Sequence, residues 1–140
     1  FSNMKKKFKA MVLSCIDPRF QNLTHNHLKK KKLTGKYSAF TIAGAAVGVT
    51  HNKFKQWHKT FYDNLATSIQ LHKIEKLIVI NHKDCGAAKI ANGKKEFSPV
   101  NEKKIHQESF LKIKKHIKKK FPKLKVESNL ISLDNKITKF

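Results

Sequence analysis

The sequence predicts an α/β fold: a single domain with a mostly parallel β-sheet flanked by helices. Two observations lead to this prediction. Short apolar segments that favour strands alternate with long amphipathic segments that favour helices. Residues 76–81 are apolar without alternation, as expected of a central parallel strand covered on both faces. The length of 140 residues fits one domain. We assign this domain to residues 4–140 and interpret residues 1–3 as a remnant of expression cloning rather than a signal peptide.

The first half of the chain contains two predicted strands and one helix. Residues 8–14 form an apolar, strand-forming segment, and Pro18 marks a break soon after it. Residues 21–33 are rich in lysine with leucines inside, which predicts a surface helix. Residues 37–43 predict a second strand, and the small residues 44–48 predict a loop where backbone or ligand approaches closely.

The second half contains the longest predicted helices. Residues 52–72 carry an apolar residue every fourth position, which places the stripe on one face of a helix as core packing: Trp57, Phe61, Leu65 and Ile69. Residues 76–81 predict the third strand, residues 86–91 a short helix and residues 101–120 a second long helix. Residues 124–140 alternate loosely and predict one or two short strands.

Candidate metal ligands follow the first and third predicted strands. Cys15 comes directly after one strand, and His82 and Cys85 come after the other. Because ligands of such sheets bind at the carboxyl ends of strands, we expect these three side chains to meet. Two thiolates and one imidazole suit zinc and leave a fourth tetrahedral position open, as in catalytic sites. Asp17 could close that position, but Arg19 would compete for its carboxylate through a bidentate contact.

The chain is strongly basic, with a formal net charge of +22. Arg19 is the only arginine among 31 basic residues. Proteins that recognise nucleic-acid bases and phosphates specifically rely on the bidentate contacts of arginine guanidinium groups. We therefore expect a lysine-coated surface with weak, salt-sensitive affinity for polyanions, and no specific nucleic-acid partner. No apolar stretch is long enough to span a membrane, so we expect no membrane association. The two cysteines and the absence of a secretory signal favour a reducing, cytoplasmic location.

Two motifs together resemble those of the β-class carbonic anhydrases. Cys-Ile-Asp-Pro-Arg at residues 15–19 is similar to the family's C-x-D-x-R motif, and His-Lys-Asp-Cys-Gly at residues 82–86 is similar to its H-x-x-C-G motif. The resemblance covers about residues 8–91. It implies a Zn²⁺ cofactor held by Cys15, His82 and Cys85.

The same resemblance implies roles for the neighbouring residues. Asp17 would accept a hydrogen bond from zinc-bound water or hydroxide while Arg19 holds it off the metal, and the hydroxide would attack CO₂ to give bicarbonate. The protein would then be a carbonate dehydratase-like zinc lyase. Two thiolate ligands keep the water less acidic than three histidines would, so we expect better activity at alkaline pH. We also expect a homo-oligomer, a dimer or higher.

The substrate side departs from the family pattern. The family carries an Arg-Asn-Ala-Gly-Asn-like stretch after its second strand, whereas residues 41–45 keep only Ala43-Gly44. We assign Ala43, Gly44 and Gly86 to the substrate pocket. Two other functions are open: a carbonyl sulfide or carbon disulfide hydrolase with the same site, and a non-catalytic basic zinc-binding protein.

The remaining polar candidates are interpreted conservatively. Asp84 could orient His82 as a hydrogen-bond acceptor or could be a solvated loop carboxylate. We expect seven further histidines to lie at the surface: His25, His27, His51, His58, His72, His106 and His116.

Overall fold

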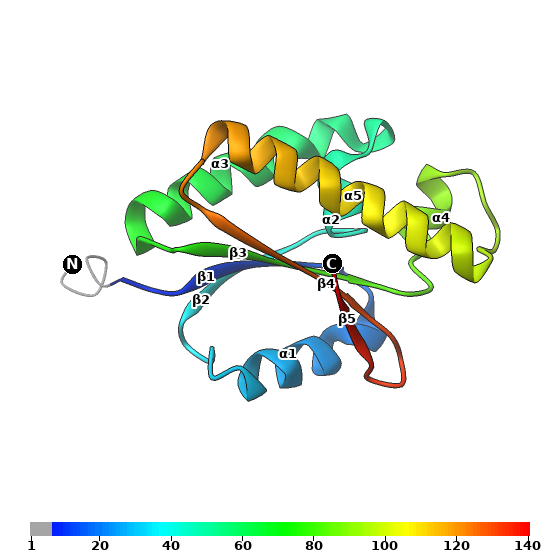
Figure 1. Ribbon diagram of the computed structural model, residues 1–140, viewed down its shortest axis with the longest axis horizontal. Coiled ribbons are helices and arrows are strands. Elements are labelled where there is room, and N and C mark those ends of the chain that lie inside the picture. The colour runs from blue at the N-terminus through cyan, green and yellow to red at the C-terminus, as the bar shows by residue number, and fades with distance from the viewer. Residues whose placement is uncertain (1–6) are drawn as a thin grey trace.

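The fold is a five-stranded sheet with helices on both faces (Figure 1). A computed structural model describes residues 7–140, so the interpretation of residues 1–3 lies outside the described part of the chain. The strand order is β2-β1-β3-β4-β5, where β5 alone pairs antiparallel. This confirms the predicted mostly parallel α/β fold. The strands are β1 (Ala10–Ser14), β2 (Tyr37–Thr41), β3 (Lys76–His82), β4 (Lys125–Ile131) and β5 (Ile137–Lys139).

The helices divide unequally between the two faces of the sheet. In Figure 1, α1 lies alone on one face, whereas α2, α3, α4 and α5 lie on the other. Their bounds are α1 (Gln21–Lys30), α2 (Ala46–Thr50), α3 (Lys55–His72), α4 (Gly86–Ala91) and α5 (Pro99–Lys120), with short 3₁₀ helices at Pro18–Phe20 and Asn52–Phe54. Among residues 7–140, no helix combines the length and the apolar character needed to cross a membrane.

The two central strands are apolar because helices cover both of their faces. Every residue of β1 is buried, as is every residue of β3 after Lys76. On the α1 face, Val12 and Ile78 pack with Phe20 and Leu28. On the opposite face the larger cluster contains side chains from β1, β3, α3 and α5, among them Leu13, Val79, Phe61, Leu65, Phe110 and Ile113.

The apolar stripe of α3 packs largely as predicted. Phe61 and Leu65 are fully buried, and Ile69 is half-buried against the same cluster. Trp57 differs from the prediction, because its ring stacks on Phe54 with centroids 4.5 Å apart rather than entering the core. The helix begins at Lys55 because residues 52–54 form a 3₁₀ turn.

The prediction of a loop at residues 44–48 holds only for residues 44 and 45, which form a turn, because the helix α2 begins at Ala46. Gly44 and Ala45 both have positive φ, at 81° and 47°, and turn the chain out of β2. At Gly48, an added Cβ would collide with the Ala43 carbonyl oxygen. The run of small residues therefore permits a tightly packed helix, and four of its five residues, Ala46 to Val49, are buried.

The last elements agree with the predicted order. Helix α5 begins two residues earlier than predicted, because the Ser98 hydroxyl caps it by accepting a 3.2 Å hydrogen bond from the Asn101 N–H, and Pro99 occupies its first turn. The tail, for which one or two short strands are predicted, forms two, β4 and β5. Asn135, at φ 63°, makes the turn between them.

Candidate metal centre

Three predicted ligands meet at the carboxyl edge of the sheet. Cys15 follows β1, His82 ends β3, and Cys85 lies directly before α4. The strands β1 and β3 pair in parallel with Ser14 opposite Ile80, so the segments that follow them emerge side by side. The ligand atoms of the three side chains all lie within 4.8 Å of one another, and all three residues are buried.

The His82 imidazole is oriented for metal binding. Its Nδ1 donates to the Lys83 carbonyl oxygen at 2.7 Å, so in the neutral imidazole Nδ1 carries the proton and Nε2 keeps its lone pair. That Nε2 is buried and has no hydrogen-bond partner among residues 7–140. The Phe20 ring stacks on the imidazole with centroids 4.0 Å apart. A fixed ring with an unpartnered, buried lone pair is what a metal ligand requires.

The two cysteines complete a donor set that zinc accepts. Both are free thiols rather than a disulfide. The Gly44 N–H donates to Cys15 Sγ at 3.3 Å. The neighbouring Cys85 thiol lowers the pKa of Cys15 against the opposing effect of burial, and the Gly44 N–H adds to the lowering. A negative sulfur beside a second sulfur and an imidazole nitrogen fits Zn²⁺ with one position left over.

Asp17 and Arg19 form a multidentate ion pair beside these three residues. The Arg19 backbone N–H donates to Asp17 Oδ1 at 2.9 Å, and Nη2 of the guanidinium donates to Oδ2 at 2.7 Å. The Arg19 hydrogen bonds hold the pKa of Asp17 below its usual value. Asp17 Oδ2 lies 3.7 Å from His82 Nε2, so the clamped carboxylate faces the ligand cluster.

Asp84 has a role that the sequence analysis did not assign. It does not accept from His82, whose Nδ1 bonds the Lys83 carbonyl instead. Its carboxylate accepts from Arg19 Nη1 at 2.9 Å and pairs with Lys89. The Asp84 N–H donates to Glu102 Oε2 at 2.8 Å. Asp84 therefore positions Arg19 rather than His82.

The three residues assigned to the substrate pocket differ in their surroundings. Gly44 is buried, contacts Cys15 through its N–H, and needs its positive φ. Ala43 is half-buried next to it. Gly86 is exposed at the start of α4 and would accept a Cβ without contact. Gly44 thus borders the Cys15 sulfur, whereas a side chain at Gly86 would meet no atom within 4 Å.

A buried polar network behind the centre was missed by sequence reasoning. Asn81 Oδ1 accepts from the Ala46 N–H at 3.0 Å, and its Nδ2 contacts His106 Nδ1 at 2.9 Å and Ser109 Oγ at 3.1 Å. His106 was predicted at the surface but is fully buried, because α5 presents it to the end of β3. An asparagine inside an otherwise apolar strand was the available signal, since a buried amide needs partners.

Comparison with known proteins agrees with this geometry. Residues 4–139 match the model of a protein family described as "Putative carbonic anhydrase". The chain belongs to this carbonic anhydrase family. Two curated relatives are an uncharacterized protein of Rickettsia bellii, 32% identical over 91% of this chain and 79% of the relative, and the uncharacterized protein RC0076 of Rickettsia conorii, 30% identical over 89% and 68%.

Solved carbonic anhydrases share the fold of this family member. The β-carbonic anhydrase CafA of Aspergillus fumigatus superposes with a TM-score of 0.63 at 11% identity, covering 96% of this chain and 76% of CafA. The carbonic anhydrase of Glaciozyma antarctica gives 0.62 at 18% identity, covering 99% and 85%. A tetrameric β-carbonic anhydrase of Sordaria macrospora gives 0.63 at 12% identity, covering 96% and 81%.

Proposed function

We propose that this chain is a zinc-dependent carbonic anhydrase that hydrates CO₂ to bicarbonate. The observation that carries the proposal is the unpartnered, buried Nε2 of His82 within 4.8 Å of the Cys15 and Cys85 sulfurs. Membership of the carbonic anhydrase family supports it. Cys15, His82 and Cys85 would hold Zn²⁺, which, when bound, lowers the pKa of a water toward neutrality and so supplies a nucleophile for CO₂.

Arg19 and Asp17 would keep the fourth coordination position of the metal free for water. Arg19 holds the Asp17 carboxylate through the contacts at 2.7 and 2.9 Å, which leaves that carboxylate less available as a fourth ligand. Asp17 Oδ2 then accepts a hydrogen bond from the attacking water and orients its lone pair toward the substrate. Ala43 and Gly44 would border CO₂ on the Cys15 side.

We also propose a homo-oligomer in a reducing, cytoplasmic compartment. The tetrameric β-carbonic anhydrase with the same fold supports the first part. The two free thiols support the second, because Cys15 and Cys85 can serve as ligands only while they are not oxidised.

Zinc analysis and stopped-flow CO₂ hydration on one preparation test the proposal. We expect close to one zinc per chain and a rate well above that of buffer at about pH 8.5. Cys85→Ser should lower both zinc content and rate, whereas Lys83→Gln, an exposed neighbour in the same loop, should leave both unchanged. Stoichiometric zinc without any CO₂ hydration would count against the enzyme and for a non-catalytic zinc-binding protein.

A second substrate class uses the same residues. Residues 41–45 keep only Ala43-Gly44 of the Arg-Asn-Ala-Gly-Asn-like stretch that the carbonic anhydrase family carries there, so a carbonyl sulfide or carbon disulfide hydrolase is the alternative. Release of sulfide from either compound, with no CO₂ hydration by the same zinc-loaded sample, would assign the chain to that class.

A further inference from the structure

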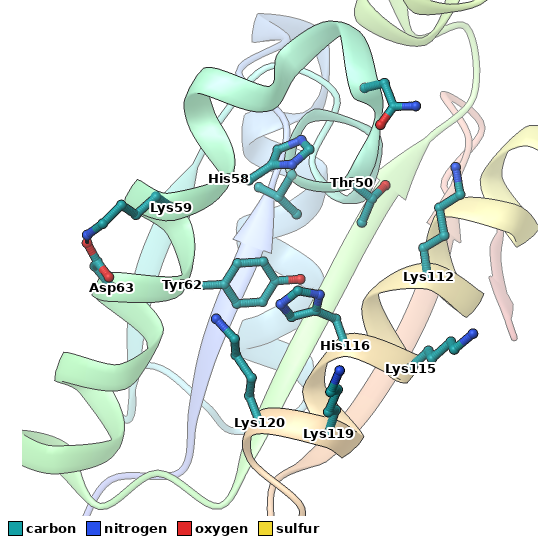
Figure 2. A pocket seen from close by; sticks show the side chains of 12 residues that line it. Thr50, His58, Lys59, Tyr62, Asp63, Lys112, Lys115, His116, Lys119 and Lys120 are labelled. Carbon is teal, nitrogen blue, oxygen red and sulfur yellow. Dashed lines mark hydrogen bonds and ion pairs between the residues drawn. The ribbon is translucent and has the colours of Figure 1, made fainter.

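A basic groove lies between the helices α3 and α5, with the end of α2 beside it (Figure 2). Its volume is about 890 Å³, within the range of pockets that hold small ligands. None of the residues that form the candidate metal centre contributes to it. The lining side chains used below are His58 and Tyr62 from α3, and Lys112, Lys115, His116 and Lys119 from α5.

The lysines of α5 reach the groove because of their spacing. Lys112, Lys115 and Lys119 are three and four residues apart, which places them along one face of the helix. Neighbouring like charges at these spacings destabilise a helix. No carboxylate among residues 7–140 lies within the 4.0 Å ion-pair distance of any of the three. The only lining carboxylate, Asp63, is already paired with Lys59 at 2.6 Å.

Polar groups without partners also lie at the groove. Figure 2 shows the Tyr62 ring between the two helices with its hydroxyl directed toward the α5 side. His58 Nε2 is buried without a hydrogen-bond partner among the described residues. Burial first, and then the nearby lysines, hold the pKa of His116 below its usual value. The groove is therefore a region of positive potential with unused hydrogen-bonding groups.

The faces of the Tyr62 ring are occupied. His116 stacks on it with centroids 4.3 Å apart, and Lys120 Nζ lies 5.5 Å from its centroid. The ring thus offers its hydroxyl edge rather than an open face, and it cannot serve as a stacking platform for a nucleic-acid base. Ammonium groups on flexible lysine stems along the α5 side of the groove, with the Tyr62 hydroxyl beside them, instead match the oxygens of linked phosphates.

We propose that this groove binds a small soluble anion that carries two or more phosphate groups. Lys112, Lys115 and Lys119 contact the phosphate oxygens, and the Tyr62 hydroxyl donates a hydrogen bond to the same ligand. A singly charged anion such as bicarbonate engages too few of these groups to be held. The binding is separate from the proposed carbonic anhydrase chemistry and requires no metal.

Calorimetry with inorganic tripolyphosphate tests the groove directly. We expect one site per chain in about 0.15 M salt, and much weaker binding of inorganic phosphate. The double variant Lys115→Gln/Lys119→Gln should weaken tripolyphosphate at least about tenfold. The matched control is Lys103→Gln/Lys104→Gln, which removes two exposed charges from the same helix outside the groove and should change the affinity less than about twofold.

Other outcomes would overturn the inference. Equal weakening by both double variants would mean that only the overall charge attracts the anion. Binding at several weak sites per chain would also show that no specific groove site exists. Amide chemical-shift changes at the lysines of α1, rather than at Tyr62 and His116, would show the same. Tighter binding of a single-stranded RNA than of tripolyphosphate, lost equally in both variants, would indicate a nucleic-acid surface. Tyr62→Phe, which keeps the stacked ring, should weaken tripolyphosphate binding without lowering the melting temperature.

Discussion

Arg19 and Asp84, 65 positions apart in the sequence, are joined by two hydrogen bonds. Arg19 Nη1 donates to Asp84 Oδ2 at 2.9 Å, and Nη2 donates to the Asp84 carbonyl oxygen at 3.0 Å. The same guanidinium clamps Asp17. One side chain therefore connects the loop after β1 to the loop after β3, and its planar guanidinium donates to four acceptor oxygens of Asp17 and Asp84.

Replacing the Arg19 guanidinium by a lysine ammonium should lower the proposed CO₂ hydration activity while zinc stays bound. In Arg19→Lys, one ammonium cannot reach both Asp17 and Asp84 in the present geometry, so Asp17 is released. We expect kcat/KM for CO₂ hydration to fall about 10- to 100-fold, with zinc content unchanged. Asp84→Asn, which keeps the shape but loses the charge, should give a smaller decrease. An Arg19→Lys enzyme as active as the wild type would contradict the positioning role.

The buried amide of Asn81 should matter more for stability than a comparable amide near the surface. Asn81→Ala leaves the Ala46 N–H and the Ser109 hydroxyl without this partner inside the protein. We expect the free energy of unfolding in urea to fall by about 2 to 4 kcal/mol. Asn92→Ala removes a single hydrogen bond to the Ala88 carbonyl at a half-buried position and should cost about 1 kcal/mol. Equal losses in the two variants would argue against the network.

Two glycines near the centre should respond differently to alanine. At Gly48 the new methyl group would collide with the rigid backbone carbonyl of Ala43, so Gly48→Ala should lower the free energy of unfolding by about 1 to 3 kcal/mol. Gly86 is the first residue of α4, and a Cβ there would contact nothing. Gly86→Ala should therefore raise the free energy of unfolding by less than about 1 kcal/mol. Thermal unfolding of both variants tests the close packing of α2 against the end of β2.

His106 should make the protein less stable as the pH falls. Burial lowers its pKa from 6.5 to about 4, because removal from water disfavours the protonated imidazole. In the neutral ring Nδ1 accepts a hydrogen bond from Asn81. The unfolded chain binds a proton below 6.5, so this contribution is fully present above that pH and is lost as the pH falls toward 4. We expect about 2 kcal/mol of unfolding free energy to be lost between about pH 7.5 and about pH 5.

The His106→Gln variant isolates this effect from the other titrating groups. Urea unfolding of wild type and variant at both pH values gives a difference that should shrink on acidification by that amount. Metal release at low pH affects both proteins and cancels in the comparison. If the difference in unfolding free energy between wild type and variant did not change with pH, the pKa of His106 would be the same in the folded and unfolded protein.

The local sequence pattern was sufficient for most elements but not for the segment after β2. An unbroken apolar run predicted β3, and an apolar residue at every fourth position predicted α3, because both patterns can be seen directly in the sequence. Residues 44–48 carry no such period, and their small side chains form α2 only because Gly48 approaches Ala43 closely and α2 is buried. Similarly, His106 and its lysine-rich neighbours look like a solvent-exposed face until α5 packs against β3.

By itself, the sequence determined the fold class, the strand ends at which the site lies and the three candidate ligands Cys15, His82 and Cys85. These follow from residue type and spacing, which are properties of the chain alone. Only the tertiary structure decided that Asp84 holds Arg19, that Asn81 joins α2 to α5, and that the lysines of α5 gather beside Tyr62. Each of these contacts joins segments that lie far apart in the sequence. No local sequence pattern indicates which side chains such packing brings together.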